Sequence, residues 1–267
     1  MSDINQCYGG FFCVFFVNVF SIVGDSRQTV VPSLTTFHVL FHREHNRIVD
    51  ILCGLNPHWK GDRLYQEARK ILIGIYQQIV YNEYLPIIIG KVVMKWLGIL
   101  PTPKGFNTRY DKHVDASIRN SFAVAPFRFG HAKILHDIGS ASKDRSLRTK
   151  VPMAPEFFKT RLVRDKHVFG VDGISRWITT EFNYLSDRFI ADSVRNQLFE
   201  TKPGNGFDLV AIDIQRGRDH GIPSYNEFRR FCGLKPAIIF KGGPFGLPDH
   251  DPKAAEILSL IYKYVLI

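Results

Sequence analysis

The stretch that decides the fold runs Ala116-Ser-Ile-Arg-Asn-Ser-Phe-Ala-Val-Ala-Pro-Phe-Arg-Phe-Gly-His131. Its apolar residues recur at helical spacing, which predicts a helix with one buried apolar band. That band consists of Ile118, Phe122, Ala125 and Phe129. Pro126 falls inside this helix, where a proline removes a backbone hydrogen bond, so we expect the helix to bend shortly before His131.

Arg128 precedes His131 by three residues, so their side chains are expected to project from the same helical face. A lone histidine on a helix is more often a structural group than a ligand. A cation and an imidazole that emerge together, however, suit an anionic cofactor that carries a metal. The imidazole can ligate haem iron, and the guanidinium can pair with a haem propionate.

A second stretch, Asp213-Ile-Gln-Arg216-Gly-Arg-Asp-His-Gly221, again places an acid and an arginine three residues apart. A histidine bound to iron usually donates its other N–H to a carboxylate, carbonyl or amide, which fixes its tautomer. Asp213 is therefore the candidate acceptor behind His131. Arg216 is the candidate for a second propionate clamp.

Seven segments follow one another in a characteristic order along the chain. They are Gly24-Asp-Ser-Arg27, Arg43-Glu-His-Asn-Arg47, Leu55-Asn-Pro-His-Trp59, Tyr65-Gln-Glu-Ala-Arg-Lys70, Tyr81-Asn-Glu-Tyr-Leu-Pro86, Phe127-Arg-Phe-Gly-His131 and Ile214-Gln-Arg-Gly-Arg-Asp-His-Gly-Ile-Pro223. Together they closely resemble the animal haem peroxidase family. The resemblance implies a mainly α-helical fold, incomplete at both ends, with residues 24–267 as a partial haem peroxidase domain.

The resemblance also implies an activity: reduction of hydrogen peroxide with oxidation of an organic or halide donor, as part of the response to oxidative stress. Haem b is then the expected cofactor, with His131 as axial iron ligand and with Asp213, Arg128 and Arg216 as further cofactor-binding residues. Arg27 matches the family's distal catalytic arginine, which stabilises the charge on the departing oxygen during O–O cleavage. Members of the family are secreted, which implies an extracellular location.

Two features of the family have no counterpart in this sequence. Upstream of the Gly-Asp-x-Arg motif, the family has a histidine that moves the peroxide proton and, directly after it, an aspartate that binds calcium. The earliest histidine here is His38, which follows Arg27. We therefore expect the calcium site to be missing and turnover to be impaired, because proton transfer contributes about 10²–10⁴-fold in rate.

Val30 stands where many members carry the carboxylate that forms an ester with haem, so haem is not expected to be ester-linked. With the missing histidine, this residue supports an alternative function. The chain would then be a non-catalytic peroxidase-like binding or adhesion module, or a truncated inactive product. A partner or a missing half of the domain would complete the pocket.

Composition limits the other classes of partner. A net charge of +10 over 267 residues permits nucleic acid or an acidic membrane surface. There is no run of basic residues and no nucleic-acid-binding motif, so no nucleic acid is expected. The four cysteines, Cys7, Cys13, Cys53 and Cys232, follow no zinc or redox spacing and suit a secreted protein with one or two disulfides, whose pairing stays open.

Residues 1–23 form an unassigned apolar segment outside the resemblance. The segment is too short to span a bilayer comfortably, so no stable membrane span is expected. Its length suits the core of a signal peptide, but the first six residues carry no positive charge and no small-x-small cleavage site follows. A buried strand is the alternative interpretation, and both stay open.

Periodicity predicts two long helices after this segment. The first runs from Pro32 to Leu55, with Thr35 or Thr36 as its cap. The second runs from about Asp62 to Tyr84 and is closed by Pro86. The expected inward-facing residues are Phe37, Leu40, Phe41, Ile48 and Leu52 in the first helix and Leu64, Ala68, Ile71, Leu72, Ile75 and Ile79 in the second.

The remaining chain is predicted to be helical with surface connections and no run of strands. Residues 140–155 are expected to cross the surface, and residues 174–200 to hold one or two helices. Ser224 and Glu227 have the spacing of a capping box, and Gly233 is expected to stop that helix. A last amphipathic helix is predicted to begin at Asp251.

Overall fold

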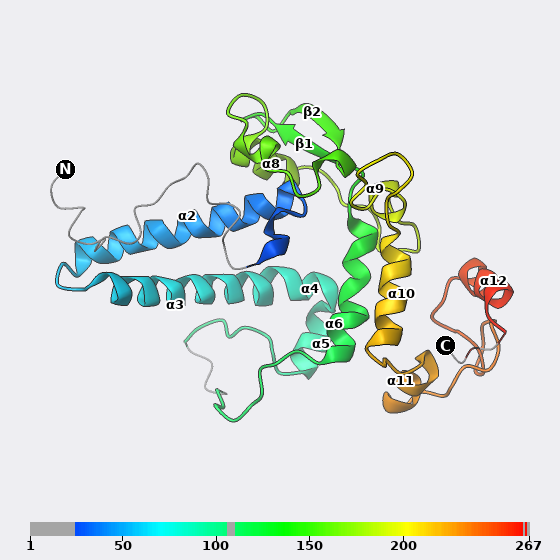
Figure 1. Cartoon of the computed structure of the whole chain (residues 1–267). Helices are drawn as coiled ribbons and strands as arrows, with labels where there is room; N and C mark the ends of the chain where they lie inside the picture. Colours follow the sequence, from blue (N-terminus) through cyan, green and yellow to red (C-terminus); the bar gives the residue numbers. More distant parts are fainter. Residues whose placement is uncertain (1–24, 106–109, 264, 266–267) are drawn as a thin grey trace. The chain divides into compact units, whose positions relative to one another are not determined.

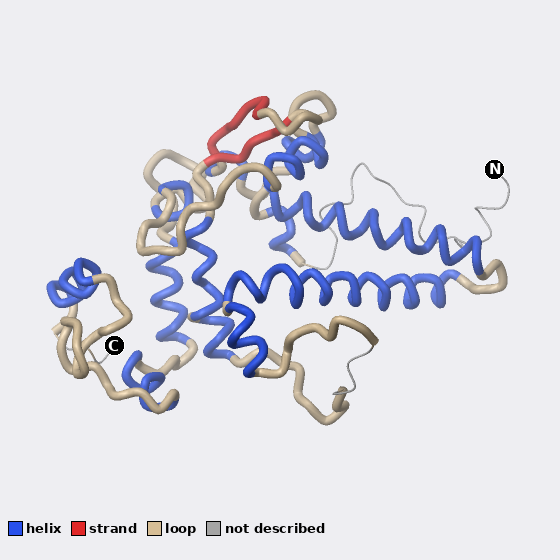
Figure 2. The backbone as a smooth tube through the Cα atoms, turned by 180° about the vertical axis from the view of Figure 1, so that it is seen from behind, coloured by secondary structure: helices blue, strands red, loops and turns tan. Residues whose placement is uncertain are grey.

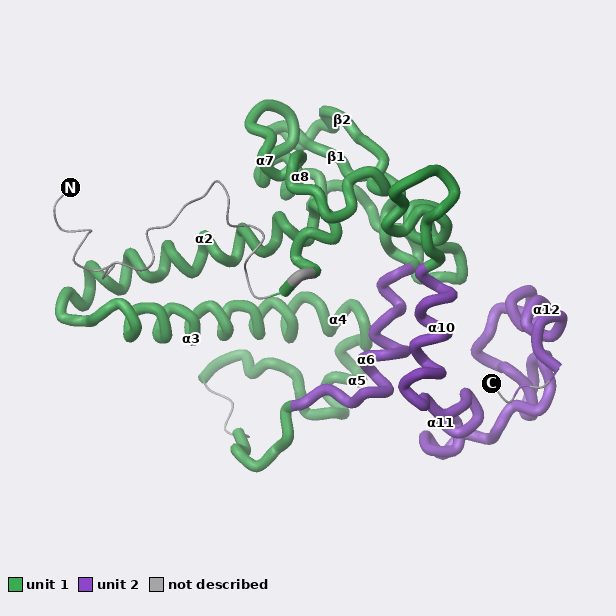
Figure 3. The backbone as a smooth tube through the Cα atoms, viewed as in Figure 1, with its two compact units in different colours: residues 1–116, 132–208 green, residues 117–131, 209–267 purple. Residues whose placement is uncertain are grey.

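The computed structural model describes residues 25–105, 110–263 and 265, so residues 1–23 lie outside the described part. The chain divides into two compact units, coloured separately in Figure 3. Unit 1 comprises residues 1–116 and 132–208, and unit 2 comprises residues 117–131 and 209–267. Helices make up most of the regular structure (Figures 1 and 2), which confirms the expected mainly α-helical class.

Unit 1 begins with its long helices and ends with short elements around a small sheet. In chain order these are η1 (Ser26–Thr29), α2 (Pro32–Leu55), α3 (Gly61–Ile79), η2 (Val80–Tyr84), α4 (Leu85–Ile88), α5 (Gly90–Trp96), β1 (Asp137–Ala141), β2 (Leu147–Pro152), η4 (Ala154–Glu156), α7 (Arg161–Arg164), α8 (Gly170–Ile178) and α9 (Asp192–Arg195). Unit 2 contains α6 (Asn120–Val124), the start of η3 (Pro126–Lys133), α10 (Leu209–Asp219), α11 (Tyr225–Phe231) and α12 (Pro252–Ile261).

Helices α2 and α3 form a long hairpin, visible in Figures 1 and 2. Both ends of α2 fall where the sequence predicted them, because a proline in the first turn and Asn56-Pro57 at the end are local signals. The helices contact each other through four buried residues. These are Ile48 and Val49 of α2 and Leu64 and Ala68 of α3.

The predicted buried faces of the two helices were largely wrong. Side chains expected to be buried are instead exposed, namely Phe37, Leu40, Ile71, Ile75 and Ile79. Nor do the two threonines cap α2, which has Val31 at its N-cap position. The hydroxyl of Thr36 instead donates to the carbonyl of Pro32 at 2.9 Å, and both threonines are buried inside the helix.

The second long helix continues past Pro86 instead of ending there. The chain widens at Val80–Tyr84 into a π-helical turn, in which the Leu85 N–H donates to the Val80 carbonyl. Pro86 then lies in the first turn of α4, where the N–H that proline lacks is not required. The prediction that this proline closes the helix was therefore wrong.

A two-stranded antiparallel hairpin, β1–β2, occupies the segment expected to be a strandless surface crossing. Its first strand is almost entirely buried against α8, where Trp177 lies over Gly139. A Cβ at Gly139 would lie 2.7 Å from Cε2 of Trp177, so only glycine permits this approach. The strand is therefore held by packing, a signal that hydrophobic periodicity does not carry.

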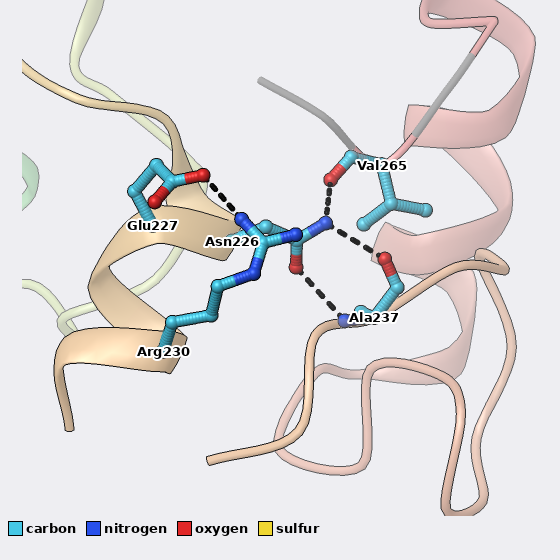
Figure 4. Close-up of polar contacts among 5 residues, drawn as sticks. All are labelled: Asn226, Glu227, Arg230, Ala237 and Val265. Atoms are coloured by element: carbon cyan, nitrogen blue, oxygen red, sulfur yellow. Dashed lines mark hydrogen bonds and ion pairs between the residues drawn. The ribbon is translucent and has the colours of Figure 1, made fainter. Parts of the chain in front are cut away.

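In unit 2, a buried asparagine ties the C-terminal segment to α11 (Figure 4). Asn226 is 1% exposed and donates to the carbonyls of Ala237 and Val265 at 2.8 and 2.7 Å. It also accepts from the Ala237 N–H at 2.8 Å. These bonds join residues that also pack in the small apolar core of the unit.

The ends of the last helices agree in part with the sequence predictions. Ser224 is the N-cap residue of α11, but its side chain makes no capping bond, and Glu227 pairs with Arg230 instead. The predicted capping box was therefore wrong. Gly233, at φ +71°, follows the end of α11, and Asp251 caps α12, as predicted.

The cysteines that the structure describes differ in state. Cys53 is disulfide-bonded, whereas Cys232 is free and exposed. Cys7 and Cys13 lie outside the described residues.

Candidate functional site

The predicted ligand helix breaks in two in unit 2. Helix α6 ends at Val124, and after Ala125 the chain continues as the 3₁₀ helix η3, which starts at Pro126 and carries His131. The expected bend at the proline is thus present and complete. The predicted buried band was wrong, because Ile118 and Phe122 are exposed.

His131 and Asp213 form the closest polar contact of unit 2 that bears on chemistry. Nδ1 of His131 and Oδ2 of Asp213 lie 2.5 Å apart, although 82 residues separate the two in the sequence. The side chains are 22% and 18% exposed. The carboxylate fixes the proton on Nδ1, so Nε2 carries the lone pair that can bind a metal.

Two arginines flank this pair along the sequence. Arg128 is three residues before His131 on η3, and its Nε donates to the Ala123 carbonyl at 3.1 Å. Arg216 is three residues after Asp213 on α10, and its Nε is buried without a hydrogen-bond partner among the described residues. A buried, unpaired guanidinium donor is costly unless an anion satisfies it. This residue therefore fits an anionic group such as a propionate.

A second hydrogen bond links the same two segments and was not foreseen from the sequence. Nδ1 of His220, the residue after α10, lies 2.9 Å from Oδ1 of Asn120, the first residue of α6. Both side chains are exposed. The only sequence signal was their position, since one lies inside each of the two stretches that carry the site.

Arg27 belongs to unit 1, where it lies in η1. Asp25 caps this turn by accepting from the Arg27 N–H at 2.8 Å. The same carboxylate binds the guanidinium in a bidentate pair, with Nε at 2.9 Å and Nη2 at 2.7 Å. The hydrogen bond from Arg27 lowers the pKa of Asp25 from 3.8 to about 2, so the pair is ionised at neutral pH.

The turn that carries Arg27 is anchored by its backbone carbonyls. The Gln28 carbonyl accepts from the hydroxyl of Thr35 at 3.0 Å, and the Val30 carbonyl accepts from the Phe158 N–H at 3.3 Å. The Arg27 side chain itself is 78% exposed. The backbone is thus fixed while the guanidinium stays accessible.

Other kinds of site find no support in the described part of the chain. There, no cluster of three or more His, Cys, Asp or Glu side chains is arranged to hold a metal ion. No helix in these residues is long and apolar enough to traverse a bilayer.

Comparison with known proteins identifies the class. The profile of the animal haem peroxidase family matches residues 17–265. The chain therefore belongs to the animal haem peroxidase family.

Individual relatives agree with this assignment. Myeloperoxidase of Mus musculus is 39% identical over 225 residues, and lactoperoxidase of Mesocricetus auratus is 40% identical over 249 residues. These alignments cover 82% and 91% of this chain. Peroxidase A from Dictyostelium discoideum superposes with a TM-score of 0.74 at 32% identity, over 91% of this chain and 43% of that one.

The chain spans only about a third of the two curated relatives, 30% of the myeloperoxidase and 31% of the lactoperoxidase. The residues of unit 2 nevertheless fit the family's cofactor. They provide an imidazole with a free Nε2, a carboxylate behind it and a buried unpaired arginine donor.

Proposed function

We propose that this chain carries the proximal part of a haem peroxidase site and takes part in the reduction of hydrogen peroxide. The observation that supports the proposal most strongly is the hydrogen bond between His131 and Asp213, which leaves Nε2 free to bind iron. Bound haem supplies the redox chemistry by which peroxide is reduced and an organic or halide donor is oxidised.

Each residue of the chain then has a physical role. Asp213 holds the imidazole of His131 in one tautomer and increases its electron donation. Arg216, whose Nε lacks a partner, neutralises a propionate, and Arg128 neutralises the other. Arg27 binds the oxygen on which negative charge develops as the peroxide bond breaks.

The haem is held without an ester bond in this proposal, because Val30 cannot form one. No histidine precedes Arg27 in the 267 residues, so peroxide turnover by this chain alone is expected to be slow. The disulfide at Cys53 suits an oxidising compartment and supports an extracellular location.

The alternative is a non-catalytic peroxidase-like binding module, for which Val30 and the missing histidine speak. One experiment separates the two functions. Haemin is titrated into the purified protein while the Soret band is followed, and guaiacol oxidation by hydrogen peroxide is then measured. Haem binding with turnover above that of free haemin supports the peroxidase, whereas binding with no such excess supports the module.

The ligand assignment has its own test. His131→Ala is expected to abolish the haemin-induced Soret shift, whereas His113→Leu, a change at an exposed loop histidine, is expected to leave it intact. Unchanged haem binding by His131→Ala would reject His131 as the ligand.

A further inference from the structure

The hydrogen bond between Asn120 and His220 lies between the same segments as the bond between His131 and Asp213. Asn120 precedes His131 on one segment, and His220 follows Asp213 on the other. The two bonds therefore join α6–η3 to α10 in an antiparallel sense, one near each end of the contact. Figure 1 shows α6 and α10 next to each other within unit 2.

The spacing on α10 directs both residues to the same neighbour. His220 comes seven residues after Asp213 (220 − 213), which is about two helical turns, or roughly 10 Å along the axis. Side chains two turns apart project from one side of a helix. The bonds are thus two attachment points on one face of α10.

His220 is held firmly by the way α10 ends. The Gly221 N–H donates to the Arg218 carbonyl at 3.0 Å, and the Ile222 N–H donates to the Gly217 carbonyl at 2.9 Å. This is the Schellman pattern, with Gly221 at φ +61° in the left-handed position that it requires. The backbone of His220 therefore has little freedom, and its ring points in a defined direction.

We propose that Asn120 and His220 are a positioning pair, which holds the His131 segment at the distance that lets Asp213 reach Nδ1. The reason is that the helix carrying His131 is broken after Val124, so the α-helical ladder does not continue from Asn120 to His131. A second attachment to α10 restores the order that the break removes. The inference rests on the proposed function, since it concerns the same His131.

The test uses the full chain without haem, so that it does not depend on haem binding. A proton in a short hydrogen bond to a carboxylate resonates far downfield in the NMR spectrum, and its loss in His131→Ala assigns it to Nδ1. In His220→Leu and in Asn120→Ala we expect this proton to shift upfield and to exchange with water about fivefold faster, the effect of losing one hydrogen bond of ordinary strength.

Rescue separates positioning from a general effect on folding. His220→Asn places an amide N–H close to the position of Nδ1, so it is expected to restore the downfield resonance. His113→Leu is the matched control and should leave the resonance unchanged. Thermal unfolding midpoints of all variants are measured in parallel and are expected to stay close to that of the unaltered chain.

The outcomes distinguish this inference from the proposed function. A downfield resonance that is unchanged in His220→Leu, or absent from the unaltered protein, would overturn the positioning role. Failure of both His220→Leu and Asn120→Ala to fold would also overturn it, by showing a general structural role. The expected NMR result together with no haem binding would leave the positioning pair standing and reject the proposed function.

Discussion

Replacement of Asp213 tests how strongly the carboxylate supports His131 as a ligand. Asp213→Ala removes a 2.5 Å hydrogen bond between two side chains that are only 22% and 18% exposed. A hydrogen bond to a charged group contributes about 1.5–3 kcal/mol, which corresponds to about one to two orders of magnitude in affinity. Loss of the group that supports a metal-binding histidine typically costs about 10–100-fold, in agreement. We therefore expect haemin to bind Asp213→Ala about 10–100-fold more weakly.

Asp213→Asn should cost less, for a reason visible in the structure. Oδ1 of Asp213 is buried and has no hydrogen-bond partner in the described part of the chain. The amide nitrogen of asparagine can take that position while the amide oxygen still accepts from His131. Only the charge is lost, and because charge roughly doubles the strength of such a bond, binding should weaken by about fivefold.

The assay is a haemin titration followed at the Soret band. Asp219→Ala, at an exposed acid on the same helix, serves as the control and should bind haemin like the unaltered chain. Affinity of Asp213→Ala within about twofold of the unaltered protein, where His131→Ala has lost binding, would contradict a supporting role for the carboxylate.

Three further predictions concern stability and charge. Asn226→Ala removes three buried hydrogen bonds and should lower the free energy of unfolding of its segment by about 3 kcal/mol, measurable as faster amide exchange; normal exchange would contradict the arrangement in Figure 4. Gly139→Ala should cost about 1–3 kcal/mol through overpacking against Trp177, measured by denaturant unfolding, and equal stability would mean that this contact is looser than described. Asp25 has a lowered pKa of about 2, so its ion pair with Arg27 should be intact above about pH 4 and break as the pH falls through 2; carboxylate NMR should show this midpoint, and a return toward 3.8 in Arg27→Leu, while a midpoint near 3.8 in the unaltered chain would refute the pair.

Local signals in the sequence were sufficient for helix ends but not for buried faces. The limits of α2 follow from Pro32 and from Asn56-Pro57, because these residues act on the backbone next to them. Which face of α2 is buried depends on elements far away in the sequence, and Phe37 is exposed whereas Val39 packs near Trp177. The β1–β2 hairpin was missed for the same reason.

The candidate site could be anticipated where spacing carries chemistry. The Asp-x-x-Arg spacing on α10 directed attention to Asp213 and Arg216, and the structure supplies the distance from Asp213 to His131. Their roles toward haem stay predictions. The link between Asn120 and His220 could not be anticipated, because it joins two polar residues 100 positions apart and depends on how the helices cross.

The π-helical turn at Val80–Tyr84 has a consequence for how this segment tolerates change in length. A π turn holds one more residue than an α turn, and each residue of an α-helix advances the pattern by about 100°. Deleting a single residue there would convert the turn to ordinary α geometry and rotate α4 and everything that follows in the helix by about that angle. Pro86 would then meet the carbonyl that the wide turn now keeps clear of its ring. The segment thus behaves like a gear with one extra tooth, and insertions or deletions should be tolerated before α3 or after α5 rather than within it.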